Sequence, residues 1–231
     1  MVKSRNFRSW SAWWGIELSE VSTKEKFVSI LGGFLSILVL LSITSPAWGH
    51  APMVVASMGA SAVLLFAIPH GQLSQPWPVI AGHALSAAMG VACGQWISCP
   101  QLAGACSVAL AIGLMHQFKC IHPPGGATAL TAVLGGPAVH AMGYKFVAFP
   151  VIANASVMVA VAVIYNVVFS WRKYPASLNQ KETKQFSTNE APTHEEIVSA
   201  LRSLDSFVDI TEDDLLRLLQ ILTRCSDTSK Q

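Results

Sequence analysis

The sequence has 231 residues, of which 52% are hydrophobic and 12% are charged. This balance argues against a soluble domain and a nucleic-acid partner, and it is typical of a small integral membrane protein. All 13 acidic residues lie before Phe27 or after Trp171, and between these positions only Lys119 and Lys145 are charged. A membrane body with two cations and no carboxylate should repel cations and favour an anion. The five cysteines show no CxxC pair or zinc-type spacing, so we expect free thiols, no metal and no cofactor.

Residues 1–26 form a basic, tryptophan-rich segment that precedes a hydrophobic stretch from Phe27 to Thr44. This arrangement fits the cytoplasmic interface and the positive-inside rule, which predicts a cytoplasmic N-terminus. The stretch is long enough to span a hydrocarbon core of about 30 Å. No cleavage site marks a removable signal peptide, so we expect the first helix to insert the chain into the cell inner membrane.

Two short hydrophobic segments alternate with longer helices in the next hundred residues. The first runs from Met53 to Ile68 between prolines, and the second from Ala127 to Leu134 after the sequence His-Pro-Pro-Gly-Gly at 122–126. Longer helices are predicted over 79–97, 102–118 and 144–171. Because Arg172-Lys173 follows the last helix, the C-terminus is also predicted inside, which requires an even number of crossings.

The pattern G-A-[ST]-A-[VL] occurs at 59–63 and again at 126–130. It divides the body into two three-segment halves, and three crossings per half would make the repeats inverted. Short, Gly/Pro-interrupted segments at matching positions are typical of a transporter binding site. Alternatively, both segments are re-entrant and the chain crosses four times. The six-crossing arrangement is favoured, because four crossings would put Lys119 and Lys145 both outside.

The segment from His122 to Gly126 breaks a hydrophobic region and should begin a short helix. Such a start is expected to leave free N–H groups and a positive dipole end, which suit an anion. His122 has a ring that titrates near neutral pH, although a capping role is the alternative. The predicted substrate-binding residues are His122, Gly125, Gly126, Ala127, Thr128, Ser57, Gly59, Ser61, Lys119, Lys145 and His83.

Each hydroxyl in this set has a structural alternative, because Ser and Thr in membrane helices commonly bond their own backbone. His83 has the alternative of hydrogen bonding between helices. A metal site made of His83, His116 and His122 would lack a carboxylate, and no acid/base pair indicates an enzyme.

The composition becomes polar after residue 175. Residues 176–192 read as a linker, and two capped amphipathic helices within 193–231 should form a cytoplasmic helical hairpin. This hairpin is too small to bury its apolar faces alone, so it should dock on the membrane body or on another subunit.

Four ordered motifs resemble the HPP family of integral membrane proteins: SMGASAVLLFA at 57–67, QPWPVIAGH at 75–83, HPPGGATAL at 122–130 and RKYP at 172–175. The resemblance covers most of residues 27–175. The hairpin is similar to the tail of some bacterial members, and the chain has no room for the CBS pair of others. Plant relatives are associated with nitrite movement across the plastid envelope, so the resemblance implies nitrite as a substrate.

These observations predict an all-α, polytopic membrane helix bundle with a 3+3 repeat and a C-terminal helical hairpin. The predicted function is a transporter or channel for a small monovalent anion, nitrite first. The expected partners are the anion, the lipid bilayer and further copies of the chain. The alternative function is a membrane sensor that signals through its C-terminal hairpin.

Overall fold

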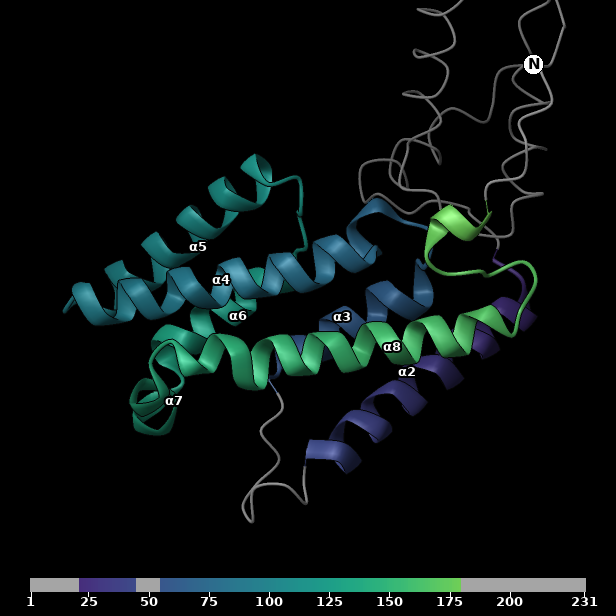
Figure 1. The fold of residues 1–231 in the computed structure, drawn as a ribbon, viewed down its shortest axis with the longest axis horizontal. Helices are drawn as coiled ribbons and strands as arrows, with labels where there is room; N and C mark the ends of the chain where they lie inside the picture. The colour runs from purple at the N-terminus through teal and green to yellow at the C-terminus, as the bar shows by residue number, and fades with distance from the viewer. Residues whose placement is uncertain (1–20, 45–54, 180–231) are drawn as a thin grey trace, which may run out of the picture. The chain divides into compact units, whose positions relative to one another are not determined.

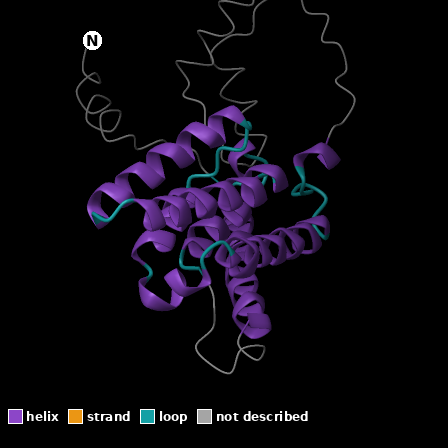
Figure 2. Ribbon diagram, turned by 60° about the vertical axis from the view of Figure 1, so that its left-hand side comes forward, coloured by secondary structure: helices purple, strands orange, loops and turns teal. Residues whose placement is uncertain are grey.

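A computed structural model of the chain describes residues 21–44 and 55–179. All regular structure in these two ranges is helical, as Figure 2 shows, which confirms the all-α prediction. The helices described below belong to one compact unit, Lys26–Gln185, apart from the first three residues of the first helix. The hairpin predicted at 193–231, most of the linker and most of the basic N-terminal segment lie outside the described residues.

Three helical stretches in the described part of the chain are long and apolar enough to cross a membrane: α2 (Thr23–Thr44), α4 (Pro76–Trp96) and Val147–Val167. Two shorter apolar helices have 11 residues each, α3 (Ser57–Ala67) and α6 (Pro124–Leu134). The remaining elements are η1 (Gln72–Ser74), α5 (Pro100–Gln117), α7 (Gly136–Met142) and η3 (Ala176–Asn179).

The sequence predicts one uninterrupted helix over 144–171, but the structure shows a break in this stretch. It consists of a wide turn, η2 (Val147–Ile152), followed by α8 (Ala153–Val167). The break falls at Phe149, whose backbone is extended with φ −140° and ψ 123°, and Pro150 follows it. Proline lacks an N–H group and pushes the preceding residue out of the helical region, which explains the break.

Helix α4 is central to the bundle, because it contacts α5, α6 and α8 (Figure 1). At Gly90 a Cβ atom would lie 2.5 Å from the carbonyl oxygen of Ala129 and 2.6 Å from the Cβ of Ala132. The backbones of α4 and α6 therefore touch, and a small residue such as Gly90 permits this close helix contact.

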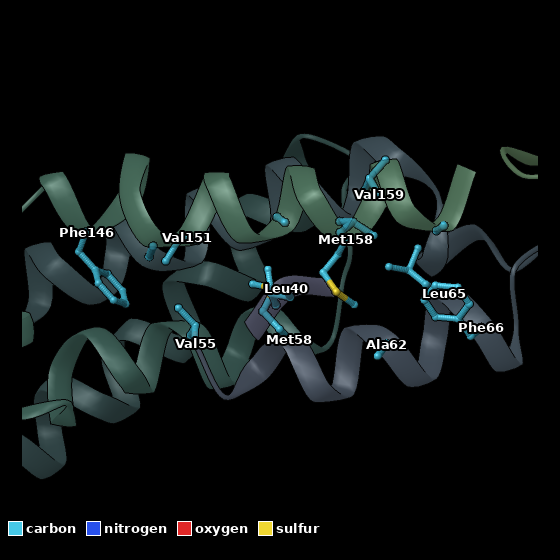
Figure 3. Packing of buried hydrophobic residues seen from close by; sticks show 14 of the residues in the cluster. Leu40, Val55, Met58, Ala62, Leu65, Phe66, Phe146, Val151, Met158 and Val159 are labelled. Atoms are coloured by element: carbon cyan, nitrogen blue, oxygen red, sulfur yellow. The ribbon is translucent and has the colours of Figure 1, made fainter. Parts of the chain in front are cut away.

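A hydrophobic core joins α2, α3 and α8, and Figure 3 shows its side chains. Leu40 of α2, Met58 and Phe66 of α3 and Met158 of α8 are all buried in it. Helix α2 is also tied by a polar contact, because the hydroxyl of Tyr165 donates to the carbonyl oxygen of Val28 at 2.8 Å.

Arg172, which is used above as a positive charge that marks the cytoplasmic side, is buried just beyond α8. Its guanidinium donates to the side chain of Asn166 at 3.1 Å, to the hydroxyl of Ser29 at 3.1 Å and to the carbonyl oxygen of Phe66 at 2.6 Å. A planar group with five donors can satisfy several acceptors at once, so this side chain joins α2, α3 and the end of α8.

Candidate functional site

Five polar side chains meet inside the helix bundle and are here called the polar cluster: Ser57, Ser61, His83, His122 and Thr128. All five are buried, and all five are among the predicted site residues. They come from α3, α4, α6 and the loop that precedes α6. Buried polar groups need hydrogen-bond partners, and these groups supply them to one another.

The cluster is a continuous chain of hydrogen bonds. The hydroxyl oxygen of Ser57 lies 2.6 Å from that of Thr128, which in turn lies 2.7 Å from Nδ1 of His83. Nε2 of His83 lies 2.8 Å from the hydroxyl of Ser61, and Nε2 of His122 lies 2.9 Å from the same oxygen. The two imidazole rings pack edge to face with centroids 4.8 Å apart.

The chain of hydrogen bonds ends at a backbone carbonyl oxygen outside the cluster. Nδ1 of His122 lies 2.8 Å from the carbonyl oxygen of Leu73 in η1. The turn η1 connects α3 to α4, so this contact ties the loop of His122 to that connection.

The N-terminal parts of α3 and α6 lie side by side and run in opposite directions, since Ser57 meets Thr128 while Ser61 meets His122. The positive ends of both helix dipoles therefore act near the cluster. Such paired starts of short helices favour negative charge.

The two short helices also match in detail. A shift of 67 residues relates the bounds of Ser57–Ala67 to those of Pro124–Leu134. The same shift relates the six buried positions of each helix, and it places Ser61 on Thr128. Both of these hydroxyls contact the ring of His83. These matches favour the 3+3 repeat, which remains a prediction.

Two glycines allow the loop of His122 to approach α4. A Cβ at Gly82 would lie 2.8 Å from the Cβ of His122 and 2.9 Å from the carbonyl oxygen of Cys120. A Cβ at Gly125 would lie 3.1 Å from the carbonyl oxygen of Gly82. Only residues without a side chain fit this contact, so the glycines fix the distance between the two histidines.

The free N–H groups expected at Gly125 and Gly126 are not free in this conformation, and that expectation is wrong. The amide of Gly125 donates to the carbonyl oxygen of His122 at 2.8 Å, and that of Gly126 to Pro123 at 3.0 Å. Bonds to the third preceding residue tighten the first turn and satisfy donors that an ordinary helix start leaves open. Contact of either glycine with a substrate stays a prediction.

Four predicted site residues lie apart from the cluster: Gly59, Ala127, Lys119 and Lys145 are exposed. Gly59 is two positions from Ser57 and from Ser61, and a helix turns by about 100° per residue, so it faces away from them. Lys119 lies in the turn after α5, and Lys145 lies just before η2. Their role in substrate binding stays a prediction.

Ser86 is a buried residue that is not among the predicted site residues. It lies three positions after His83 on α4, and its hydroxyl has no hydrogen-bond partner among the described residues. A Cβ at Gly125 would lie 2.6 Å from this oxygen, which places it beside the start of α6. The helical spacing from His83 was the available signal. Ser86 extends the polar cluster by one hydroxyl with unused bonding capacity.

No group of three metal-ligating side chains suits a metal ion within residues 21–44 and 55–179. His116, considered above as a ligand with His83 and His122, is exposed near the end of α5. The chemistry available at the cluster is therefore that of hydroxyls and imidazoles.

The helices and the buried cluster define a polytopic membrane protein with a polar site in its interior. The family described as HPP, transmembrane region, matches residues 18–175, so the chain belongs to the HPP family and the resemblance is confirmed. Two transmembrane proteins of Dictyostelium discoideum are 37% identical over 151 residues and 36% identical over 171 residues. These matches cover 63% and 71% of this chain and 53% and 55% of the relatives, so the chain spans about half of their length. No solved structure matches the chain.

Proposed function

We propose that this protein moves a small monovalent anion across a membrane, with nitrite as the first candidate. The observation that carries the proposal is the polar cluster, buried where the N-terminal parts of α3 and α6 meet. A buried polar site between two interrupted segments is the arrangement that transporters use for substrate.

Charge supports an anion over a cation. Glu25, at the start of α2, is the one acidic residue in the described part of the sequence, and the cluster contains no carboxylate. The cluster is built of O–H and N–H groups and lies near two positive helix ends. A small planar anion with two oxygens needs few donors, and Ser86 adds one more.

The choice of nitrite comes from the family, whose plant members are associated with nitrite movement. We also propose that the chain crosses the cell inner membrane six times and that both termini lie on the cytoplasmic side. The lipid bilayer and further copies of the chain are the proposed partners, and no catalytic step is proposed.

The test is flux through liposomes that contain the purified full-length chain. Nitrite, nitrate, chloride and formate are compared at one concentration, and protein-free liposomes give the leak of each. The proposal expects protein-dependent uptake of at least one small anion and none of sodium or potassium. Cation uptake without anion uptake would contradict it.

A second candidate function is that of a membrane sensor that signals through the predicted C-terminal hairpin, and two hydrogen bonds favour it. The buried hydroxyl of Tyr174 donates to the carbonyl oxygen of Ser74 at 2.8 Å, and the amide of Ala176 donates to the side chain of Gln75 at 2.9 Å. Burial raises the pKa of the Tyr174 phenol, so this donor keeps its proton. The segment leading to the predicted hairpin thus holds the turn whose Leu73 carbonyl bonds His122. Nitrite-dependent protease protection of residues 193–231, without flux, would favour sensing.

A further inference from the structure

An anion in the polar cluster would need a compensating charge. Burying an ion in a low-dielectric interior is costly unless it is paired. None of the hydrogen bonds that join the side chains of the cluster involves a Lys or Arg, and the two lysines of the membrane body are exposed. The groups within the cluster that can become cationic are the rings of His83 and His122.

The hydrogen bonds permit a definite order of protons when both rings are neutral. The carbonyl of Leu73 can only accept, so Nδ1 of His122 carries the proton and Nε2 accepts from Ser61. The single proton of Ser61 is then used, so Nε2–H of His83 donates to Ser61.

The order of protons is also definite at the other end of the hydrogen-bond chain, from His83 to Ser57. Because Nε2 of His83 carries the proton, its Nδ1 accepts from the hydroxyl of Thr128. Thr128 has then used its proton, so Ser57 donates to Thr128. Each of the four hydrogen bonds between side chains of the cluster has one donor and one acceptor in this arrangement.

The cluster has room for one more proton without moving a heavy atom. If Nε2 of His122 becomes protonated, Ser61 accepts from both rings and turns its own proton to the carbonyl oxygen of Ser57, 3.3 Å away. A second added proton would charge two rings whose centroids are 4.8 Å apart, and like charges at this separation repel. The unit of His83, Ser61 and His122 therefore accommodates a single proton.

Few other titratable groups face this unit in the described residues. Cys120 lies on the loop of His122, and Tyr174 lies across η1 with its hydroxyl on Ser74. The titratable or charged groups on the other elements packed against the unit have contacts elsewhere. Cys93 packs with Ala103 and Val133, and Cys106 packs beside them. Tyr165 donates to the carbonyl oxygen of Val28, and Arg172 donates to that of Phe66.

We propose that the unit of His83, Ser61 and His122 takes up one proton with each anion, so that proton and anion cross together and no net charge moves. One N–H bond forms at a ring nitrogen when the anion binds, and the same bond breaks when the anion leaves on the other side. The inference rests on the proposed anion transport and adds the proton as the second transported species.

The experiment measures initial rates of nitrite uptake into liposomes with the full-length chain. A pH difference and a potassium diffusion potential set with valinomycin are imposed separately. Nitrous acid is a weak acid that leaks through lipid, so the rate in protein-free liposomes is subtracted. Nitrate, whose acid is strong, is run in parallel to limit this leak.

The coupled mechanism predicts that uptake rises several-fold when the outside is more acidic and does not respond to an inside-positive potential. His83→Gln and His122→Gln keep hydrogen bonding but cannot titrate, so their remaining uptake should lose the response to pH and follow the potential. His116→Gln, an exposed histidine on α5, is the control and should behave as the wild type.

Wild-type uptake that follows the potential and ignores the pH difference would overturn the coupling and leave anion transport standing. Coupled uptake that persists in both glutamine variants would overturn the assignment to these rings. No protein-dependent uptake of any anion under any gradient would overturn the proposed function itself.

Discussion

The hydroxyl oxygen of Ser57 lies 2.6 Å from that of Thr128, which joins the first residue of α3 to the second turn of α6. Each of these helices has 11 residues, so each is about 16 Å long, roughly half of a hydrocarbon core of about 30 Å. Two half-length helices that enter from opposite faces would meet near the middle of the membrane. We therefore expect the substrate site to lie at the depth of this contact between the two hydroxyls, near the middle of the membrane.

The packing of α4 on α6 predicts that Gly90→Ala destabilises the protein. The added Cβ would lie 2.5 Å from the carbonyl oxygen of Ala129, so the backbones must separate. We expect a loss of about 1–3 kcal/mol in the free energy of unfolding, as for other overpacked sites. The measurement is the midpoint of thermal unfolding in detergent.

Gly113→Ala is the matched control, because nothing lies within 4 Å of a Cβ built at this position on α5. Alanine is the better helix former by about 1 kcal/mol, so this variant should unfold at the same temperature or higher. Equal midpoints for Gly90→Ala and the wild type would show that α4 and α6 can separate freely.

Arg172→Gln should also destabilise the protein, whereas Lys173→Gln should not. The buried guanidinium donates to Asn166, Ser29 and Phe66, and its loss leaves buried acceptors unsatisfied. We expect a loss of about 3 kcal/mol, within the range for hydrogen bonds to charged groups. Lys173 is exposed, so its replacement serves as the control. Similar unfolding midpoints for the two variants would contradict the role of Arg172 as a link between helices.

The double variant Lys119→Gln, Lys145→Gln should slow anion uptake at normal expression. Both lysines are exposed, so their effect is to attract the anion rather than to hold it, and salt should screen that attraction. We expect a several-fold lower rate at low ionic strength and a smaller difference at high ionic strength. Unchanged uptake at low ionic strength would assign both lysines to the membrane interface.

The six-crossing prediction places positions 119 and 145 on opposite sides of the membrane, with position 119 cytoplasmic. Single cysteines at these positions, in a background without the five natural cysteines, are labelled with a membrane-impermeant thiol reagent. Labelling of both positions from the same side would favour four crossings with α3 and α6 re-entrant.

The helices were largely predictable from the sequence, because prolines mark the ends of the long apolar stretches. The break at Phe149 was missed although Pro150 was its signal, since the residue before a proline is pushed out of the helical region. The separate helix α7 was not predicted either.

The five side chains of the polar cluster were among the residues predicted from the sequence, but their contacts were not predictable. The repeated pattern pointed to Ser61 and Thr128, yet that both bond the ring of His83 depends on how three helices pack. The free amides expected at Gly125 and Gly126 were wrong because the first turn of α6 tightens onto preceding carbonyls. Local sequence does not distinguish such a turn from an open helix start.

The most direct measurement compares two threonines on α6 that are three residues apart. Thr128 belongs to the polar cluster, while the hydroxyl of Thr131 bonds its own backbone at Ala127. Uptake of nitrite is measured in liposomes with matched amounts of wild type, Thr128→Val, Thr128→Ser and Thr131→Val.

Valine removes the hydroxyl and keeps the branched shape, and serine restores the hydroxyl. We predict that Thr128→Val loses at least about tenfold in uptake rate, equivalent to about 1.4 kcal/mol. Thr128→Ser should recover most of this rate, and Thr131→Val should equal the wild type. Uptake by Thr128→Val at the wild-type rate would contradict the assignment of the polar cluster as the anion site.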